Sequence, residues 1–297
     1  MLSRYLCYSD NTMQAAIARV KDFTASLLRL TRVWNLLIIA LAQYFTAAYL
    51  VDEDVVLNPR LALLTVSTLL VAAAGYIIND YYDVKIDLIN KPDRVVVGRS
   101  IGRRYALLLH SVFSVAGIAI GTYLSLWIGA VNLFSVWLLW LYSNTLKRKP
   151  FVGNVAVALL TGLSILVVDA LFYPHHSLIW IYALFAFFMT LVREIVKDME
   201  DLKGDNTFGC RTLPILLGIR RTKAIIFLIL IVFLTSVVVL NRSYTQLPLY
   251  YFVLFLFAPV SLLAIWLLRA DMKKEFTWIS TFCKVILVLG IISMAFV

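Results

Sequence analysis

The chain has 297 residues, of which 62% are hydrophobic and 15% are charged. Soluble globular proteins are about 45–50% apolar and about 25% charged, so this composition excludes a soluble globular enzyme, a disordered protein and a fibrous protein. The net charge is +10, from 27 Lys and Arg against 17 Asp and Glu; in so apolar a chain this excess is typical of basic cytoplasmic loops and does not indicate a nucleic-acid partner. We therefore expect most of the chain to lie in a lipid bilayer.

The N-terminal segment 1–32 precedes the first long apolar run. Arg19, Lys21 and Asp22 interrupt it, which argues against the apolar region of a secretory signal peptide. We expect this segment to be cytoplasmic and to lie at the membrane interface as an amphipathic helix.

Nine apolar runs follow, each close to the 20 or so residues that an α-helix needs to cross a bilayer. The stretch 105–143 is too long for one span, and the region Leu126–Gly129 is the expected break within it. The runs are continuous and do not alternate with a period of two, which excludes a transmembrane β-barrel. The sequence thus predicts an all-α, polytopic membrane helix bundle. The expected spans are 33–51, 61–78, 105–122, 127–143, 153–173, 178–196, 223–240, 249–268 and 277–297.

Basic residues alternate between the two sides of this expected bundle. The N-terminal segment and the second, fourth, sixth and eighth connections carry five, six, three, seven and three Lys or Arg residues, if Arg193 and Lys223 at the edges of their spans are counted with the sixth connection; the other connections carry one, none, none and one. By the positive-inside rule, the N-terminus and the basic loops are cytoplasmic and the C-terminus lies outside after nine crossings. No targeting signal is visible, so we expect the plasma membrane.

Two acidic motifs of equal spacing lie at the cytoplasmic ends of the second and sixth expected spans. Both read D-x-x-D-x-x-x-D, and their separation of 118 residues suggests a repeat of two related half-bundles. Their aspartates are Asp80, Asp83 and Asp87 in the first motif and Asp198, Asp201 and Asp205 in the second.

On an α-helix, steps of three and seven residues turn by about 300° and 340°, so the three acids of each motif would share one helical face. Clustered carboxylates repel one another, whereas a surface built for solubility would more usually mix charges of both signs. Mg²⁺ relieves such repulsion, because it binds a few carboxylates together with phosphate oxygens of a substrate. Nearby cations, in particular Arg94, Lys147 and Lys203, add what an anionic phosphate ligand requires.

The chain resembles the UbiA superfamily of intramembrane prenyltransferases. The resemblance covers most of its length and includes, besides the two motifs, the segments 31–35, 90–94, 142–148 and 153–154. It implies one transmembrane prenyltransferase domain over 33–297 after the N-terminal segment. Within the superfamily, the run 79–94 is most similar to the digeranylgeranylglyceryl phosphate synthase branch, whose members prenylate a glycerol-phosphate ether.

This resemblance implies transfer of an isoprenyl chain from an allylic diphosphate to a lipophilic acceptor, with release of diphosphate. The prenyl diphosphate donor, the acceptor and the bilayer are then the expected partners, with no obligate protein partner. One Mg²⁺ would be held by Asp80, Asp83 and Asp87, and another by Asp198, Asp201 and Asp205. The implied catalytic residues are Asp83, Asp201 and Lys147. The implied diphosphate-binding residues are Asn79, Arg94, Lys147, Lys203, Arg32 and Asn35.

Two alternatives remain open at this point. After Arg94 the chain reads Val95-Val96-Val97-Gly98-Arg99 where the family often has a proline-containing stretch, so an aromatic acceptor of a quinone pathway competes with the glycerol-phosphate ether. A transporter is the more distant alternative, because ionisable residues within spans often mark ion pathways. The candidates for that role are weak: Asp169 lies near the outer end of its span, and Lys284 can extend its side chain to the interface.

Overall fold

The computed structural model of the chain describes residues 21–173, 177–245 and 248–297. Over these ranges the protein is a bundle of helices, and the one extended pairing is an isolated bridge between Val97 and Ile101. The all-α prediction is therefore confirmed. Of the expected N-terminal segment, residues 1–20 lie outside the described ranges, and residues 21–30 are helical.

The elements are named here by their order along the chain. The α-helices are α2 (Val33–Leu50), α3 (Pro59–Asn90), α4 (Arg103–Leu124), α5 (Leu126–Asn144), α6 (Val152–Phe172), α7 (Ser177–Glu200), α8 (Leu202–Thr207), α9 (Leu213–Leu240), α10 (Leu249–Phe252), α11 (Ala258–Arg269) and α12 (Lys273–Ser293). Short 3₁₀ or π turns are η1 (Glu53–Leu57), η2 (Pro92–Arg94), η3 (Leu146–Arg148), η4 (Asn241–Thr245), η5 (Val253–Phe257) and η6 (Met294–Phe296).

Nine helical segments within the described residues are long and apolar enough to cross a bilayer. They coincide in order with the nine expected spans, and the expected break near Leu126 falls at Ser125, which caps the start of α5. The edges differ where a helix continues past its apolar run. The expected span 61–78 is part of α3, and the expected span 223–240 is part of α9, which begins at Leu213 and is broken at Gly218 by a φ of 77°.

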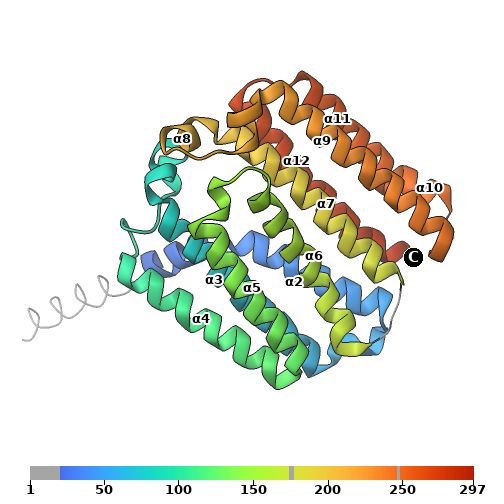
Figure 1. Cartoon of the computed structure of the whole chain (residues 1–297). Helices are drawn as coiled ribbons and strands as arrows, with labels where there is room; N and C mark the ends of the chain where they lie inside the picture. Colours follow the sequence, from blue (N-terminus) through green and yellow to red (C-terminus); the bar gives the residue numbers. More distant parts are fainter. Residues whose placement is uncertain (1–20, 174–176, 246–247) are drawn as a thin grey trace, which may run out of the picture.

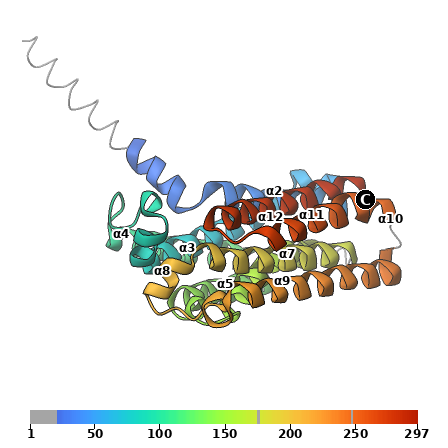
Figure 2. The ribbon, with the colours of Figure 1, turned by 90° about the horizontal axis from the view of Figure 1, so that it is seen from above.

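Helix α7 lies in the middle of the bundle and packs against α6, α9 and α12 (Figure 1). It buries a larger share of its apolar stretch than any other of the nine segments. Helix α4 lies at one edge, where it packs against α3 and α5, while α9 and α11 lie at the opposite edge. Both views place α8 and the α3–α4 connection at one end of the bundle, and α10 and the C-terminus at the other (Figures 1 and 2).

Helix α3 extends the first acidic motif beyond the apolar layer. It begins at Pro59, where the Asn58 side chain accepts a hydrogen bond from the Arg60 N–H, and ends at Asn90, because Pro92 disfavours a helical conformation at Lys91. Its 32 residues span about 48 Å at 1.5 Å per residue, against a hydrocarbon core of about 30 Å. Since its apolar run ends at Ile78, the last three turns carry the aspartates toward the end of the bundle.

The second motif does not lie on one helix. Helix α7 ends at Glu200, Asp201 turns the chain with φ −95° and ψ 7°, and α8 begins at Leu202. The prediction of a single acidic helical face is therefore confirmed for the first motif and wrong for the second. There is a local and a tertiary reason for this break. Gly204 is a weak helix former, and the Asn90 side chain of α3 bonds both to the Asp201 carbonyl and to the Gly204 N–H.

Candidate active site

The first motif presents its carboxylates to basic partners from two other elements. Asp83 is almost fully buried and forms an ion pair with Lys147 of η3. Asp80 accepts a hydrogen bond of 2.7 Å from the guanidinium of Arg32, the residue before α2. Asp87 is half-buried and lies close enough to Asp83 and Lys147 for their charges to act on it.

The second motif is held by different partners. Asp198, on the last turn of α7, accepts a hydrogen bond of 2.9 Å from the Asn154 side chain of α6. The carboxylate of Asp201 lies 2.9 Å from Lys91 Nζ. Asp205 is buried on α8; burial, together with the nearby Asp201 and Asp83 carboxylates, raises its pKa to about 6 although the Lys147 charge acts in the opposite direction.

The end of α3 is fastened to the turn that carries the second motif. Asn90 Nδ2 donates to the Asp201 carbonyl at 3.0 Å, and the Gly204 N–H donates to Asn90 Oδ1 at 2.9 Å. A Cβ at Gly204 would lie 2.5 Å from the Asn90 side chain, so this approach needs glycine. Residues more than 110 positions apart in the sequence are thereby brought to one site.

Lys147 lies between the two motifs. Its ammonium forms an ion pair with Asp83 and also interacts electrostatically with Asp205. Burial alone would lower the pKa of Lys147, but the Asp83 carboxylate raises it well above its ordinary value. Lys147 is therefore a permanent positive charge within a group of six aspartates.

The backbone around Lys147 is positioned by a close approach of η3 to the start of α6. A Cβ on Gly153 would lie 2.9 Å from the Leu146 carbonyl oxygen and 3.2 Å from Lys147 Cα. Both are tighter than ordinary van der Waals contact. Glycine at this position lets the turn carrying Lys147 pack directly on α6.

The chemistry of this donor set fits Mg²⁺ with a phosphorylated substrate. Among the described residues, no three His, Cys, Asp or Glu side chains lie close enough together to hold one metal ion. Mg²⁺ does not require such a cage, since it usually takes one or two carboxylates and completes its shell with water and substrate phosphate oxygens. Hard carboxylate oxygens, several of them already near cations, are the ligands that this mode of binding uses.

Of the other residues expected to bind the diphosphate, some lie beside the aspartates and others are exposed. Arg32 is in the site, with its guanidinium 5.0 Å from the centre of the Tyr76 ring as well as beside Asp80. Asn79 precedes Asp80 on α3, and its buried Oδ1 has no hydrogen-bond partner among the described residues. Arg94 on η2 and Lys203 on α8 are exposed and form no ion pair within the described chain.

Several residues of the site escaped the sequence analysis. Lys91 was grouped with the basic loop residues, yet it bridges Glu200 at 3.2 Å and Asp201 at 2.9 Å. Asn154 lay in a segment that carried the resemblance, which was the available signal for its contact with Asp198. Asn35, whose role at the diphosphate stays a prediction, accepts a hydrogen bond of 3.0 Å from Lys284 of α12, a contact that the sequence did not predict.

An apolar cavity of about 50 Å³ lies inside the bundle between α2, α6, α7 and α12. Its lining includes Ile38, Thr161, Phe185, Leu287 and Gly290. Ile38 and Leu287 lie one turn further along their helices than Asn35 and Lys284. The cavity therefore begins one helical turn beyond the polar residues of α2 and α12.

Comparison with known proteins identifies the family. A model of the UbiA prenyltransferase family matches residues 36–286. A digeranylgeranylglyceryl phosphate synthase of Sulfurisphaera tokodaii is 33% identical over 248 residues, which are 82% of this chain and 88% of that protein. One of Methanoregula boonei is 36% identical over 200 residues, 67% of this chain and 70% of that protein.

Two solved structures share the fold. One, of a digeranylgeranylglyceryl phosphate synthase in membranes, matches with a TM-score of 0.70 and 22% identity and covers 92% of this chain and 97% of its own. The other, of a UbiA homologue from Archaeoglobus fulgidus bound to GPP and Mg²⁺, matches with a TM-score of 0.66 and 15% identity and covers 91% of this chain and 99% of its own. At these identities the likeness concerns the fold.

Proposed function

The chain belongs to the UbiA prenyltransferase family, and on that premise we propose that it transfers an isoprenyl chain from an allylic diphosphate to a geranylgeranylglyceryl phosphate-type ether lipid precursor, with Mg²⁺ as cofactor. The observation that carries this proposal is the convergence of six aspartates on one end of the bundle with Lys147 between the two motifs. The names of the relatives from Sulfurisphaera tokodaii and Methanoregula boonei support the glycerol-phosphate acceptor.

Family membership also decides between the classes of function. The protein is a prenyltransferase and an integral, multi-pass membrane protein, so the transporter alternative is dropped. The aromatic acceptor of a quinone pathway remains as the second candidate. A transfer assay with both acceptors distinguishes it from the glycerol-phosphate ether.

In the proposed reaction the C1–O bond of the allylic diphosphate breaks, and diphosphate leaves with the electron pair. The acceptor hydroxyl oxygen then bonds to C1 and loses its proton to an oxygen of the departing diphosphate. Lys147 and Arg32 place positive charge beside the aspartates, where the negative charge of the leaving group develops, and such preorganised charge is a major source of catalysis. The helices around the site exclude water from the reactive carbocation.

The six aspartates, Asp80, Asp83, Asp87, Asp198, Asp201 and Asp205, are the proposed metal ligands. When bound there, Mg²⁺ would neutralise diphosphate oxygens and so favour departure of the leaving group. The homologue from Archaeoglobus fulgidus bound to GPP and Mg²⁺ supports this choice of cofactor. Arg94 and Lys203, both exposed, are proposed to contact the diphosphate from η2 and α8.

We further propose that the aspartate end of the bundle faces the cytoplasm and that the C-terminus lies outside the plasma membrane. The support is the excess of Lys and Arg in the loops at the aspartate end. No obligate protein partner is proposed.

The test is a transfer assay with purified protein in nanodiscs. Radiolabelled geranylgeranyl diphosphate and Mg²⁺ are supplied with either geranylgeranylglyceryl phosphate or 4-hydroxybenzoate. We expect label in a diether lipid, abolished by EDTA and restored by excess Mg²⁺. Label on the aromatic acid alone would keep the reaction class and overturn the proposed acceptor, and label in neither product would contradict both acceptors.

A further inference from the structure

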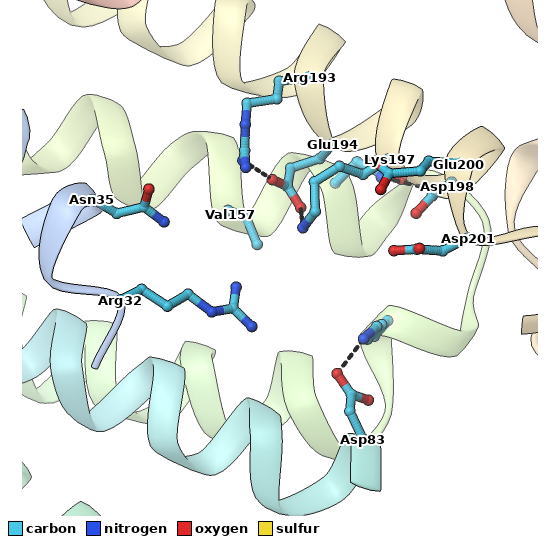
Figure 3. Close-up of polar contacts among 12 residues, drawn as sticks. Arg32, Asn35, Asp83, Val157, Arg193, Glu194, Lys197, Asp198, Glu200 and Asp201 are labelled. Atoms are coloured by element: carbon cyan, nitrogen blue, oxygen red, sulfur yellow. Dashed lines mark hydrogen bonds and ion pairs between the residues drawn. The ribbon is translucent and has the colours of Figure 1, made fainter. Parts of the chain in front are cut away.

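A second group of charged side chains lies beside the aspartates, toward the middle of the bundle. Arg193, Glu194 and Lys197 occupy the turn of α7 that precedes Asp198, and Lys284 comes from α12. Figure 3 shows Arg32, Glu194 and Lys197 around the same space that Asp83 and Asp201 border. The reaction proposed above uses none of Arg193, Lys197 and Lys284.

One carboxylate, that of Glu194, forms ion pairs with two of these cations. Glu194 Oε1 lies 2.5 Å from Arg193 Nη1, and Glu194 Oε2 lies 3.2 Å from Lys197 Nζ. Lys284 donates its hydrogen bond of 3.0 Å to Asn35, a neutral amide. The charges of Arg193 and Lys197 are close enough to act on Lys284. Arg32, on the other side of the space, is already paired with Asp80.

The charges of this group do not balance. Arg193, Lys197 and Lys284 carry three positive charges against the single negative charge of Glu194, which leaves an excess of two. Like charges withdrawn from bulk water are unfavourable unless they are paired. In addition, Arg193 Nε is buried and has no hydrogen-bond partner among the described residues. Asp198 and Asp205 also lie near Lys197, but both belong to the proposed metal site. The group is therefore suited to an anion with about two negative charges and several acceptor oxygens.

A phosphate monoester has these properties, with a charge of about −1.5 to −2 at pH 7 and three strong acceptor oxygens. We infer that Arg193, Lys197 and Lys284 bind the phosphate of the acceptor. This inference rests on the proposed function and adds to it the residues that recognise the acceptor's headgroup. The donor diphosphate would lie with the aspartates and Lys147, so the two anions would occupy neighbouring but different groups of cations.

The position of the cavity supports an amphiphilic occupant. Asn35 and Ile38 are separated by three positions on α2, and Lys284 and Leu287 by three positions on α12. Such pairs lie on the same helical face. Since Ile38 and Leu287 line the apolar cavity, a ligand with its phosphate at Lys284 would have an apolar lining one helical turn away for the first part of its chain.

The test compares Lys284→Gln, Lys284→Arg and wild type in nanodiscs by initial rates. KM is measured for geranylgeranyl diphosphate, for geranylgeranylglyceryl phosphate and for the phosphate-free geranylgeranylglycerol. We expect Lys284→Gln to raise KM for the phosphorylated acceptor about ten- to hundredfold, the size of one or two charged hydrogen bonds. The KM values of the donor and of the phosphate-free acceptor should stay within about twofold, and Lys284→Arg should restore most of the loss.

Lys274→Gln is the matched control, because Lys274 is an exposed lysine on the same helix, and it should leave all three KM values unchanged. A rise in the donor KM would assign the group to the diphosphate and overturn the inference. Equal rises for both acceptors would indicate a structural role, and no change at all would also overturn it.

Direct binding separates this inference from the proposed function. Calorimetric titration of geranylgeranylglyceryl phosphate is done without donor or Mg²⁺. If wild type binds it and Lys284→Gln does not, the phosphate site stands even if no transfer to this acceptor is detected. If wild type does not bind it, the inference is wrong, whatever acceptor the enzyme uses.

Discussion

The ion pair between Asp83 and Lys147 joins residues 64 positions apart in the sequence. Both are withdrawn from bulk water, and each would leave the other as an uncompensated charge if it were removed. In the proposed reaction both also face the diphosphate. Their effect on turnover should therefore exceed that of any surface charge.

Asp83→Asn keeps the size of the side chain and removes its charge. We expect turnover to fall at least about a hundredfold, because the variant loses a metal ligand and the partner that orients Lys147. Asp54→Asn changes an exposed acid of η1 in the same way and should retain turnover within about twofold. Rates are measured in nanodiscs together with thermal unfolding; a folded Asp83→Asn protein with near-wild-type turnover would contradict the two-motif site.

The sequence predicts which residues belong to this site only where short-range spacing or a neighbouring motif identifies them. The D-x-x-D-x-x-x-D spacing picked out Asp83 and Asp201, and its context picked out Lys147. Their roles stay predictions. The contacts of Asn90 and Lys91 with Asp201 were not predictable, because a loop lysine is more often a determinant of topology, and nothing local identifies a partner 110 positions away.

Among the elements, the turn η3 depends on the start of α6. Gly153 allows the Leu146 carbonyl and Lys147 Cα to approach the α6 backbone. The family resemblance includes Gly153 and Asn154, which follow the segment that contains Lys147. The sequence alone does not explain why a glycine is needed at position 153. The reason is this close approach.

Gly153→Ala should displace η3 and with it Lys147. We expect turnover to fall about tenfold or more, with little change in the amount of folded protein, because the clash with the 146–147 backbone is relieved by moving the turn. The control is Gly102→Ala at the start of α4, where a Cβ would meet its nearest neighbour at an ordinary 3.6 Å. Unchanged turnover in Gly153→Ala would mean that the position of η3 is not critical.

Hydropathy predicts the membrane spans of this chain but not the ends of its helices. Hydropathy identified all nine spans, since each must bury about 20 apolar residues in lipid. It ended the second span at residue 78, although α3 continues to Asn90, because the last turns leave the apolar layer. It also could not locate the break at Asp201, which depends on the tertiary contact of Asn90 with α8.

At the scale of the whole molecule, the resemblance to the UbiA superfamily is confirmed by the family match over residues 36–286. The direction in which the bundle crosses the membrane stays a prediction. It rests on the asymmetry of Lys and Arg between the two ends.

Two single-cysteine variants test this orientation. Leu57, on η1, is almost fully exposed at the end of the bundle opposite the aspartates, and Arg99 is exposed in the α3–α4 connection at the aspartate end. In a Cys7→Ser background, where Cys210 and Cys283 are buried, we expect a membrane-impermeant maleimide to label Leu57→Cys in intact cells. Arg99→Cys should react only after the membrane is permeabilised, and the reverse pattern would invert the proposed topology.

The length of α3 has a consequence for the fate of the products. Because its last three turns carry the first-motif aspartates out of the apolar layer, the proposed reaction takes place at the boundary between lipid and water, with a lipophilic chain on one side and a multiply charged leaving group on the other. Diphosphate can partition directly into water, whereas the prenylated product remains dissolved in the bilayer. The two products are thus separated as they form. This separation opposes the reverse reaction and requires no conformational change of the protein.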